Sequence, residues 1–245
     1  MTDTDAGATA YVALGDSISI DDYSGGPGTG GASLLFRNRD QDFPEWRGHD
    51  VISTFTNATF SMLATDGATT GTLLEIQLPR ALSLDVRPSL VTLTIGGNDV
   101  LGAYGNTRAA RDTIRRVAAA VSRTLALLEP ALAPGGRIVV GTVYDPSDGT
   151  GDATRLGLPP WPDGVAVIAE LNDALRTSAA AHSAAVADIH QQFLGHGVLA
   201  GDPTRSQPRP SQRELWMCNV IEPNAWGASG VRAAFWAAMH DAAAA

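Results

Sequence analysis

The sequence predicts an α/β fold, a three-layer α/β/α sandwich around a five-stranded parallel sheet. Short apolar runs alternate along the chain with longer segments of helical periodicity, and this alternation is typical of parallel sheets covered on both faces. Glycine next to a small polar residue follows each of the first three runs. No internal repeat or linker divides the chain, so residues 1–245 are predicted to form a single domain.

Five short segments are predicted as strands because they are apolar and bounded by turn residues. These segments are residues 11–14, 59–63, 90–95, 137–143 and 185–189. Helices are expected at residues 31–39, 70–78, 106–128, 163–182 and 229–244. The third helix has apolar residues at helical spacing, with Asn106 as its cap and Pro130 after its end. Residues 40–57 are polar and aromatic, and we expect them to form an irregular insertion near the functional site.

Composition excludes several classes of chemistry. The chain has a formal net charge of -9, which argues against nucleic acid as a partner. All 17 basic residues are arginine, so Schiff-base chemistry, a Ser-Lys dyad and a Walker A lysine are ruled out. The single cysteine, Cys218, cannot form an internal disulfide or a multi-cysteine metal site. We expect no metal and no cofactor.

The start of the sequence predicts no signal peptide, and no segment predicts a membrane-spanning helix. The first residues lack a basic segment and a long apolar stretch, so they do not predict a signal peptide. No run approaches the roughly 18 apolar residues of a membrane-spanning helix. These features predict a cytoplasmic protein without a membrane partner; they do not predict an oligomeric state.

Three loops at the carboxyl ends of successive strands are the candidate site. They contain Gly15-Asp16-Ser17, Asp66-Gly67-Ala68 and Gly96-Gly97-Asn98-Asp99. Ligands of open α/β sheets bind at this edge, where backbone N–H groups and short side chains from these loops should converge. Each motif alone is typical of a turn or helix cap. Their joint occurrence after three successive strands instead indicates an oxyanion-binding site.

These motifs resemble those of the SGNH (GDSL) hydrolase superfamily over nearly the whole chain. The resemblance implies a flavodoxin-like topology with Ser17 as nucleophile. It also implies that the backbone N–H groups of Ser17 and Gly67 and the side-chain amide of Asn98 hold the oxyanion. The implied function is a serine-dependent hydrolase, esterase-like or an acyltransferase, acting on a small O-acyl ester through an acyl-serine intermediate.

The last motif departs from the family pattern. Members of the family have Asp-x-x-His-Pro, in which the histidine is the base and the aspartate orients it. This chain has Asn219-Val-Ile-Glu222-Pro223, with glutamate and asparagine at those two positions. We hypothesise that Glu222 accepts the proton of Ser17 and that the Asn219 amide orients the Glu222 carboxylate. A carboxylate is a weak base near its ordinary pKa of about 4.3, which predicts slow or specialised turnover.

Two alternatives stay open on the sequence. His196 lies between glycines in a loop after the fifth predicted strand, and it is the best placed of the five histidines to act as the base instead. The second alternative is a ligand-binding protein that retains the fold and the oxyanion pocket without turnover. A nucleotide-binding protein of the same layered architecture is disfavoured, because the Gly25–Gly30 segment has no lysine where a phosphate loop needs one.

Overall fold

The computed structural model describes residues 9–55, 57–201 and 215–241. The N-terminal residues 1–8, on which the argument against a signal peptide mainly rests, and the last residues of the predicted helix 229–244 lie outside the described residues. Among the helices that are described, none is both long and apolar enough to cross a membrane.

A five-stranded parallel sheet in the order β2-β1-β3-β4-β5 forms the centre of the fold. This is the flavodoxin-like order, in which the chain switches direction across the sheet between β1 and β3. The strands are β1 (Ala10–Gly15), β2 (Thr59–Met62), β3 (Leu90–Thr94), β4 (Arg137–Gly141) and β5 (Ala185–Ala187). The predicted fold class and all five predicted strands are therefore confirmed.

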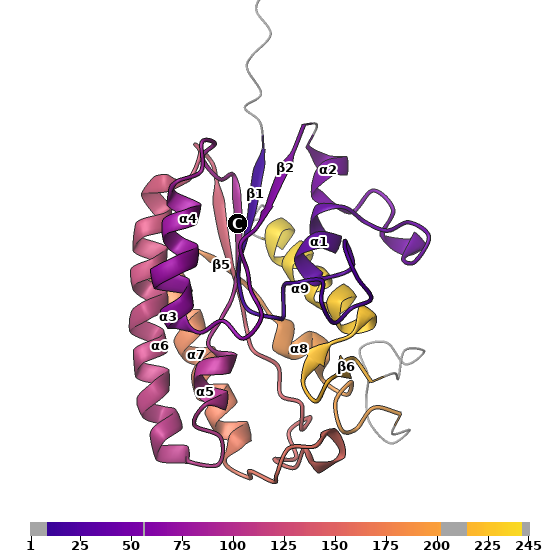
Figure 1. The fold of residues 1–245 in the computed structure, drawn as a ribbon, viewed down its shortest axis with the longest axis vertical. Helices are drawn as coiled ribbons and strands as arrows, with labels where there is room; N and C mark the ends of the chain where they lie inside the picture. Colours follow the sequence, from indigo (N-terminus) through magenta and orange to yellow (C-terminus); the bar gives the residue numbers. More distant parts are fainter. Residues whose placement is uncertain (1–8, 56, 202–214, 242–245) are drawn as a thin grey trace, which may run out of the picture.

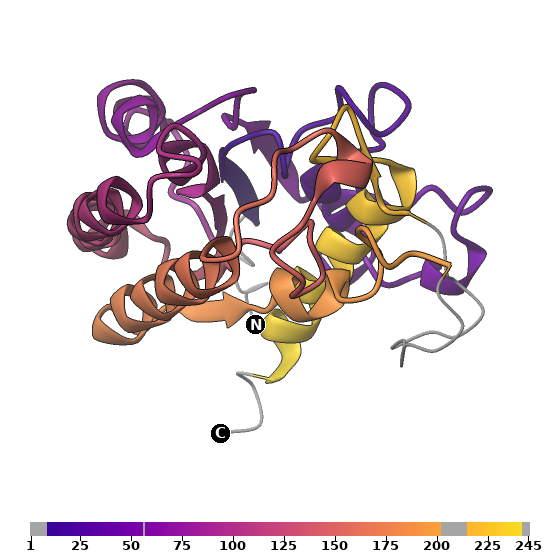
Figure 2. The ribbon, with the colours of Figure 1, turned by 90° about the horizontal axis from the view of Figure 1, so that it is seen from below.

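Helices cover both faces of the sheet, because side chains along each strand alternate between two hydrophobic cores. Val12 and Leu14 pack into the core under α6 (Thr107–Leu128) and α7 (Gly164–Ala181). Tyr11 and Ala13 face the opposite core. That second core lies under the helices α1 (Gly31–Phe36), α8 (Ile189–Phe193) and α9 (Ala225–Asp241). Figure 1 shows these helix layers on either side of the sheet, and Figure 2 shows the same layers from below.

The helix predicted at residues 70–78 is present as a helical segment of three parts, α3 (Thr70–Thr72), a π-helical turn (Leu73–Gln77) and α4 (Leu78–Leu82), which follows the second loop. Several other short elements were not predicted. The third loop runs into α5 (Gly97–Leu101), and short 3₁₀ turns lie at Glu129–Ala131 and Thr154–Leu156. An antiparallel hairpin of β6 (Met217–Cys218) and β7 (Glu222–Pro223) precedes α9. Elements of two to five residues are too short to show a hydrophobic period.

The insertion at residues 40–55 lies elsewhere than expected. It contains a 3₁₀ turn (Pro44–Trp46) and α2 (Val51–Thr54), and its Phe43 packs with Leu34 and Ala228 of α1 and α9. None of the described residues 40–55 lines the pocket at Ser17. The expectation that this insertion lies near the functional site was wrong, because its aromatic residues bury themselves against the outer helices.

Candidate active site

Ser17 lies in a tight turn that begins at Gly15, the last residue of β1. Gly15 has φ +122°, and a Cβ there would lie 1.9 Å from the carbonyl oxygen of Thr94 on β3. Only glycine fits a position of this φ and this close approach between strands. The buried Gln77 side chain accepts from Gly15 N–H and donates to its carbonyl, both at 2.8 Å. Gln77 therefore clamps the start of the Ser17 turn.

The turn itself is held by backbone hydrogen bonds. Asp16 N–H donates to the Thr94 carbonyl at 3.0 Å, and Ile18 N–H donates to the Asp16 carboxyl at 3.2 Å. Ser17 is 7% exposed. Within the described part of the chain, Ser17 N–H has no acceptor, so this donor is available to a bound ligand.

The second and third loops are joined to each other. The Asn98 amide donates to the Ala68 carbonyl at 3.1 Å, and the Asp99 carboxylate accepts from Thr70 N–H and from the Thr70 hydroxyl, the latter at 2.6 Å. A side-chain amide has two N–H hydrogens, so Asn98 keeps one for a ligand. Gly67 is exposed with φ +64°, and its N–H also has no acceptor among the described residues.

Glu222 comes to Ser17 from the other end of the sequence, on the β6–β7 hairpin. The half-buried Glu222 carboxyl and Ser17 line one pocket. Burial raises the pKa of Glu222 above its ordinary value; the neighbouring Ser17 hydroxyl lowers it in part, and the negative charge of Asp66 raises it further. Ser17 and the carboxyl expected to act on it thus lie in one site.

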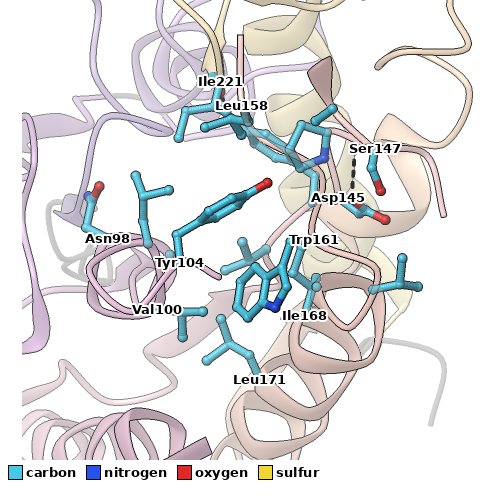
Figure 3. Close-up of a pocket in the computed structure, with 18 of the residues that line it drawn as sticks. Asn98, Val100, Tyr104, Asp145, Ser147, Leu158, Trp161, Ile168, Leu171 and Ile221 are labelled. Atoms are coloured by element: carbon cyan, nitrogen blue, oxygen red, sulfur yellow. Dashed lines mark hydrogen bonds between the residues drawn. The ribbon is translucent and has the colours of Figure 1, made fainter. Parts of the chain in front are cut away.

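Ser17, Asn98 and Glu222 all line a pocket of about 110 Å³. Figure 3 shows Asn98 at one side of this pocket, with the rings of Tyr104 and Trp161 beyond it. The remaining walls come from α5, α7, the segment of residues 143–161, and Ile221 next to Glu222. The arrangement places a hydroxyl, a carboxyl and unpaired N–H donors beside an apolar cavity.

The profile of the GDSL-like Lipase/Acylhydrolase family matches residues 13–228. The chain belongs to this family, within the SGNH superfamily. Among solved structures it resembles phospholipase A1 from Streptomyces albidoflavus NA297, with 22% identity, coverage of 96% of this chain and 99% of that chain, and a TM-score of 0.57. The extracellular lipase of Streptomyces rimosus is 25% identical over 94% of this chain and 100% of that chain, with a TM-score of 0.56.

A third similar structure is an acetylxylan esterase from Geobacillus stearothermophilus. It is 14% identical, with coverage of 94% of both chains and a TM-score of 0.60. No curated protein matches the sequence. The family is that of lipases and acylhydrolases, so the chain has the fold and the family membership of an ester hydrolase.

Asn219 does not lie where its expected role requires. It stands at the tip of the hairpin with φ +41°, and its side chain is exposed. Among the described residues the Asn219 side chain makes no hydrogen bond, to Glu222 or to any other. In the β6–β7 ladder the residue opposite Glu222 is Cys218. The expectation that the Asn219 amide orients Glu222 in this GDSL-family site is therefore corrected.

Tyr144 supports the hairpin in the place where sequence reasoning expected Asn219 to act. This buried residue donates its hydroxyl to the Ile221 carbonyl, immediately before Glu222. Its ring stacks on Phe193 at 4.2 Å between centroids, and Phe193 meets Trp216 edge-on at 5.3 Å. No motif marks Tyr144 in the sequence, because it acts through a backbone carbonyl far along the chain.

His196 is a packing residue in the structure. Its ring is fully buried and stacks on the Trp216 ring with centroids 3.7 Å apart. The backbone N–H of Trp216 donates to the backbone carbonyl of His196 at 3.0 Å. None of the five histidines lines the pocket at Ser17. The alternative that His196 is the base is corrected: glycine neighbours suggested an exposed loop, but Trp216 covers the ring.

Asp16 is the site residue that the sequence analysis overlooked. It is 1% exposed and lines the same pocket as Glu222. Burial raises the pKa of Asp16 from 3.8 to about 7, and the nearby charge of Glu222 adds to this rise. Two neighbouring carboxyls resist double ionisation. The site therefore holds Asp16 neutral below about pH 7, which favours the ionised form of Glu222.

Proposed function

We propose that this GDSL-family protein is a serine-dependent ester hydrolase in which Glu222 replaces the usual histidine base. The observation that carries the proposal is that Ser17 and Glu222 line one ligand-sized pocket, close enough for the Ser17 hydroxyl to lower the pKa of the Glu222 carboxyl. A nucleophilic hydroxyl needs an adjacent base within hydrogen-bond reach, and Glu222 is the group that meets this requirement.

The reaction follows from the positions of these groups. Glu222 takes the Ser17 proton while the Ser17 oxygen attacks the ester carbonyl. The new oxyanion accepts hydrogen bonds from Ser17 N–H, Gly67 N–H and the Asn98 amide. When the tetrahedral intermediate collapses, the carbon–oxygen bond to the alcohol breaks and Glu222 returns the proton to the departing oxygen. The acyl group is then an ester of Ser17.

Deacylation repeats these steps with water. Glu222 accepts a proton from a water molecule, the hydroxide attacks the acyl-serine, and Ser17 leaves with the proton that Glu222 returns. An alcohol in place of that water would make the same site an acyltransferase. The raised pKa of Glu222 makes it a stronger base than an exposed glutamate.

The first experiment measures turnover and covalent labelling together. The wild-type protein is incubated with a p-nitrophenyl ester and, separately, with a fluorophosphonate that phosphonylates activated serines. We expect hydrolysis above background and one label, located on Ser17 by peptide mass spectrometry. Ser17→Ala should abolish both, whereas Ser19→Ala, a buried serine in the same turn, should retain both.

The opposite result would support the binding-protein alternative. If the folded wild-type protein neither hydrolyses the ester nor takes the label, Ser17 is not a nucleophile and the proposal fails. The double variant Asn219→Asp, Glu222→His then shows what was lost. Turnover by that variant alone would mean that the oxyanion site is intact and that the base had been lost.

A further inference from the structure

We infer that the pocket beside Ser17 holds a short, uncharged aliphatic acyl chain. This inference rests on the proposed function, because it names the acyl group that Ser17 would accept. The pocket lies between α5, α7 and the segment of residues 143–161, and it begins at the groups assigned to the chemistry. Its lining, its charge and its size each point to this class of acyl group.

The lining is mostly apolar. Its aliphatic members come from α5, α7 and the loops, and they include Val100, Leu101, Ile168 and Leu171. Three rings also line the pocket: Tyr144 stacks on Phe193, and Tyr104 and Trp161 pack against each other at 4.9 Å between centroids and an angle of 61°. Because each ring packs against another ring in this way, the rings form a wall and not a cage around a cation.

The charges at the pocket exclude an anionic acyl chain. Among the residues that the structure describes, no arginine or histidine lines the pocket, whereas Asp16, Asp145 and Glu222 do. The chain contains no lysine. Asp145 is buried and occupied by its own loop, because its carboxylate accepts from Ser147 N–H at 2.8 Å and from Gly149 N–H at 2.9 Å. A terminal carboxylate or phosphate on the acyl chain would therefore be repelled.

The walls of the pocket are fixed. The Tyr104 hydroxyl donates to the Pro159 carbonyl at 2.5 Å, and the Trp161 indole N–H donates to the Thr107 hydroxyl at 3.2 Å. The Asn172 side chain exchanges hydrogen bonds of 2.7 and 2.8 Å with the backbone of Val143. Leu171 is 1% exposed. These contacts hold the pocket in one shape, so it should discriminate by length.

The volume sets that length. An engineered cavity of roughly 150 Å³ takes benzene, and this pocket measures about 110 Å³. A chain of roughly four to six carbons fits such a space. The acyl side is favoured over the alcohol side because the acyl group stays bound to Ser17 through deacylation, whereas the alcohol must leave to solvent.

The test is a length series read on both sides of the ester. We expect kcat/KM for p-nitrophenyl esters to rise about fourfold per methylene from acetyl toward hexanoyl and to fall for decanoyl. Trp161→Ala should move the optimum to longer acyl chains. Ile168→Phe, which fills the pocket, should favour acetyl. Trp236→Ala, a tryptophan of α9 outside this pocket, should leave the optimum unchanged.

Three results would overturn the inference. The first is a length profile that none of the pocket variants moves. The second is an optimum that moves with the length of the alcohol in a series of acetate esters. The third is preference for an acyl chain ending in trimethylammonium or carboxylate over its neutral equivalent. A shift of the optimum acyl length to longer chains in Trp161→Ala, or to shorter chains in Ile168→Phe, supports the inference even if the other variant fails to fold.

A binding measurement separates this inference from the proposed function. In the Ser17→Ala protein, thermal shift is measured with neutral n-alkyl methyl ketones of increasing length. Suppose that the wild-type protein hydrolyses no ester, but that ketones up to a certain length raise the Tm of the Ser17→Ala protein and Trp161→Ala extends that length. The pocket assignment then stands and the hydrolase proposal fails. If esters are hydrolysed and ketone binding has no such limit, only the pocket assignment fails.

Discussion

The nucleophile side and the base side of the site are built in different ways. Ser17, Gly67 and Asn98 follow β1, β2 and β3 and are tied together through hydrogen bonds to the sheet and between loops. Glu222 sits on a hairpin of two-residue strands outside the sheet. Loops anchored on the sheet therefore hold the proposed oxyanion donors, whereas the proposed base lies on a hairpin outside the sheet, where we expect a substitution to leave the fold intact.

The largest effect is expected for the hairpin residue in contact with Ser17. Glu222→Gln keeps the shape but removes the base, and kcat/KM for a p-nitrophenyl ester should fall about 10²–10⁴-fold. The matched control is Glu170→Gln on α7, which removes an exposed ion pair with Arg111 of α6 and should not change the rate. Both variants are assayed by initial rates at pH 8.

His196→Ala completes that comparison. Loss of a buried stacked ring should lower stability by about 2–4 kcal/mol while leaving the rate per folded molecule unchanged, as measured by urea unfolding and by active-site titration. Activity that survives Glu222→Gln but disappears from folded His196→Ala protein would contradict the assignment of Glu222 as base.

The two asparagines of the site motifs should behave differently. Asn98→Ala removes a predicted oxyanion donor, and we expect kcat to fall about 10²–10³-fold with little change in KM. Asn219→Ala alters an exposed turn side chain and should change kcat less than about threefold. Equal losses from the two variants, in steady-state kinetics, would restore Asn219 as a working member of the site.

Asp16 should make the nucleophile side sensitive to pH. Because its pKa is raised from 3.8 to about 7 in the folded protein, the neutral form stabilises the fold fully below pH 4, and this contribution is lost as pH rises toward 7. The loss is about 1.4 kcal/mol per pH unit in that window. Asp16→Asn keeps the acceptor for Ile18 N–H and should therefore be more stable than wild type at pH 8 but not at pH 4.

That prediction is checked by urea unfolding of both proteins at the two pH values. Asp173→Asn, an exposed carboxyl on α7, is the control and should show no such difference. The buried, neutral state of Asp16 would be contradicted if the difference in unfolding free energy between wild type and Asp16→Asn stayed constant between pH 4 and 7.

The smallest effect is expected at the tip of the hairpin. Val220 has φ +76° and is 40% exposed, a conformation that costs a β-branched residue about 1–3 kcal/mol. Val220→Gly should relieve part of this strain, so we expect a rise in Tm of a few degrees in calorimetry. A fall in Tm would mean that the turn is not strained in solution.

The strands and the three loops were predictable because each depends on local sequence. Residues 90–94 are apolar and β-branched, and the glycines next to Ser17 and Asn98 mark turns. The predictions of a single domain and of a cytoplasmic location stay predictions. The strands and loops that local sequence determines were thus recovered, whereas the pairing of Ser17 with Glu222, which the family motif order implied, stays a prediction.

The missed features depend on contacts between distant segments. Asn219 and Glu222 are three positions apart, a spacing that would place both on one face of a helix, but they lie in a hairpin and the Asn219 side chain is exposed. His196 is buried by Trp216, and Asp16 owes its raised pKa to burial under other elements and to Glu222. No spacing rule contains such information, because these effects arise only when the chain has folded.

The most direct test of the central claim is the pH dependence of kcat/KM for wild type and Glu222→His. The wild-type kcat/KM should rise with pH as a single group ionises. The midpoint of this rise should lie above 4.5, the ordinary pKa of glutamate, because the pKa of Glu222 is raised. In Glu222→His the rise should move to the range of histidine, about 6.5. A midpoint that is the same in both proteins would show that residue 222 is not the base that accepts the Ser17 proton.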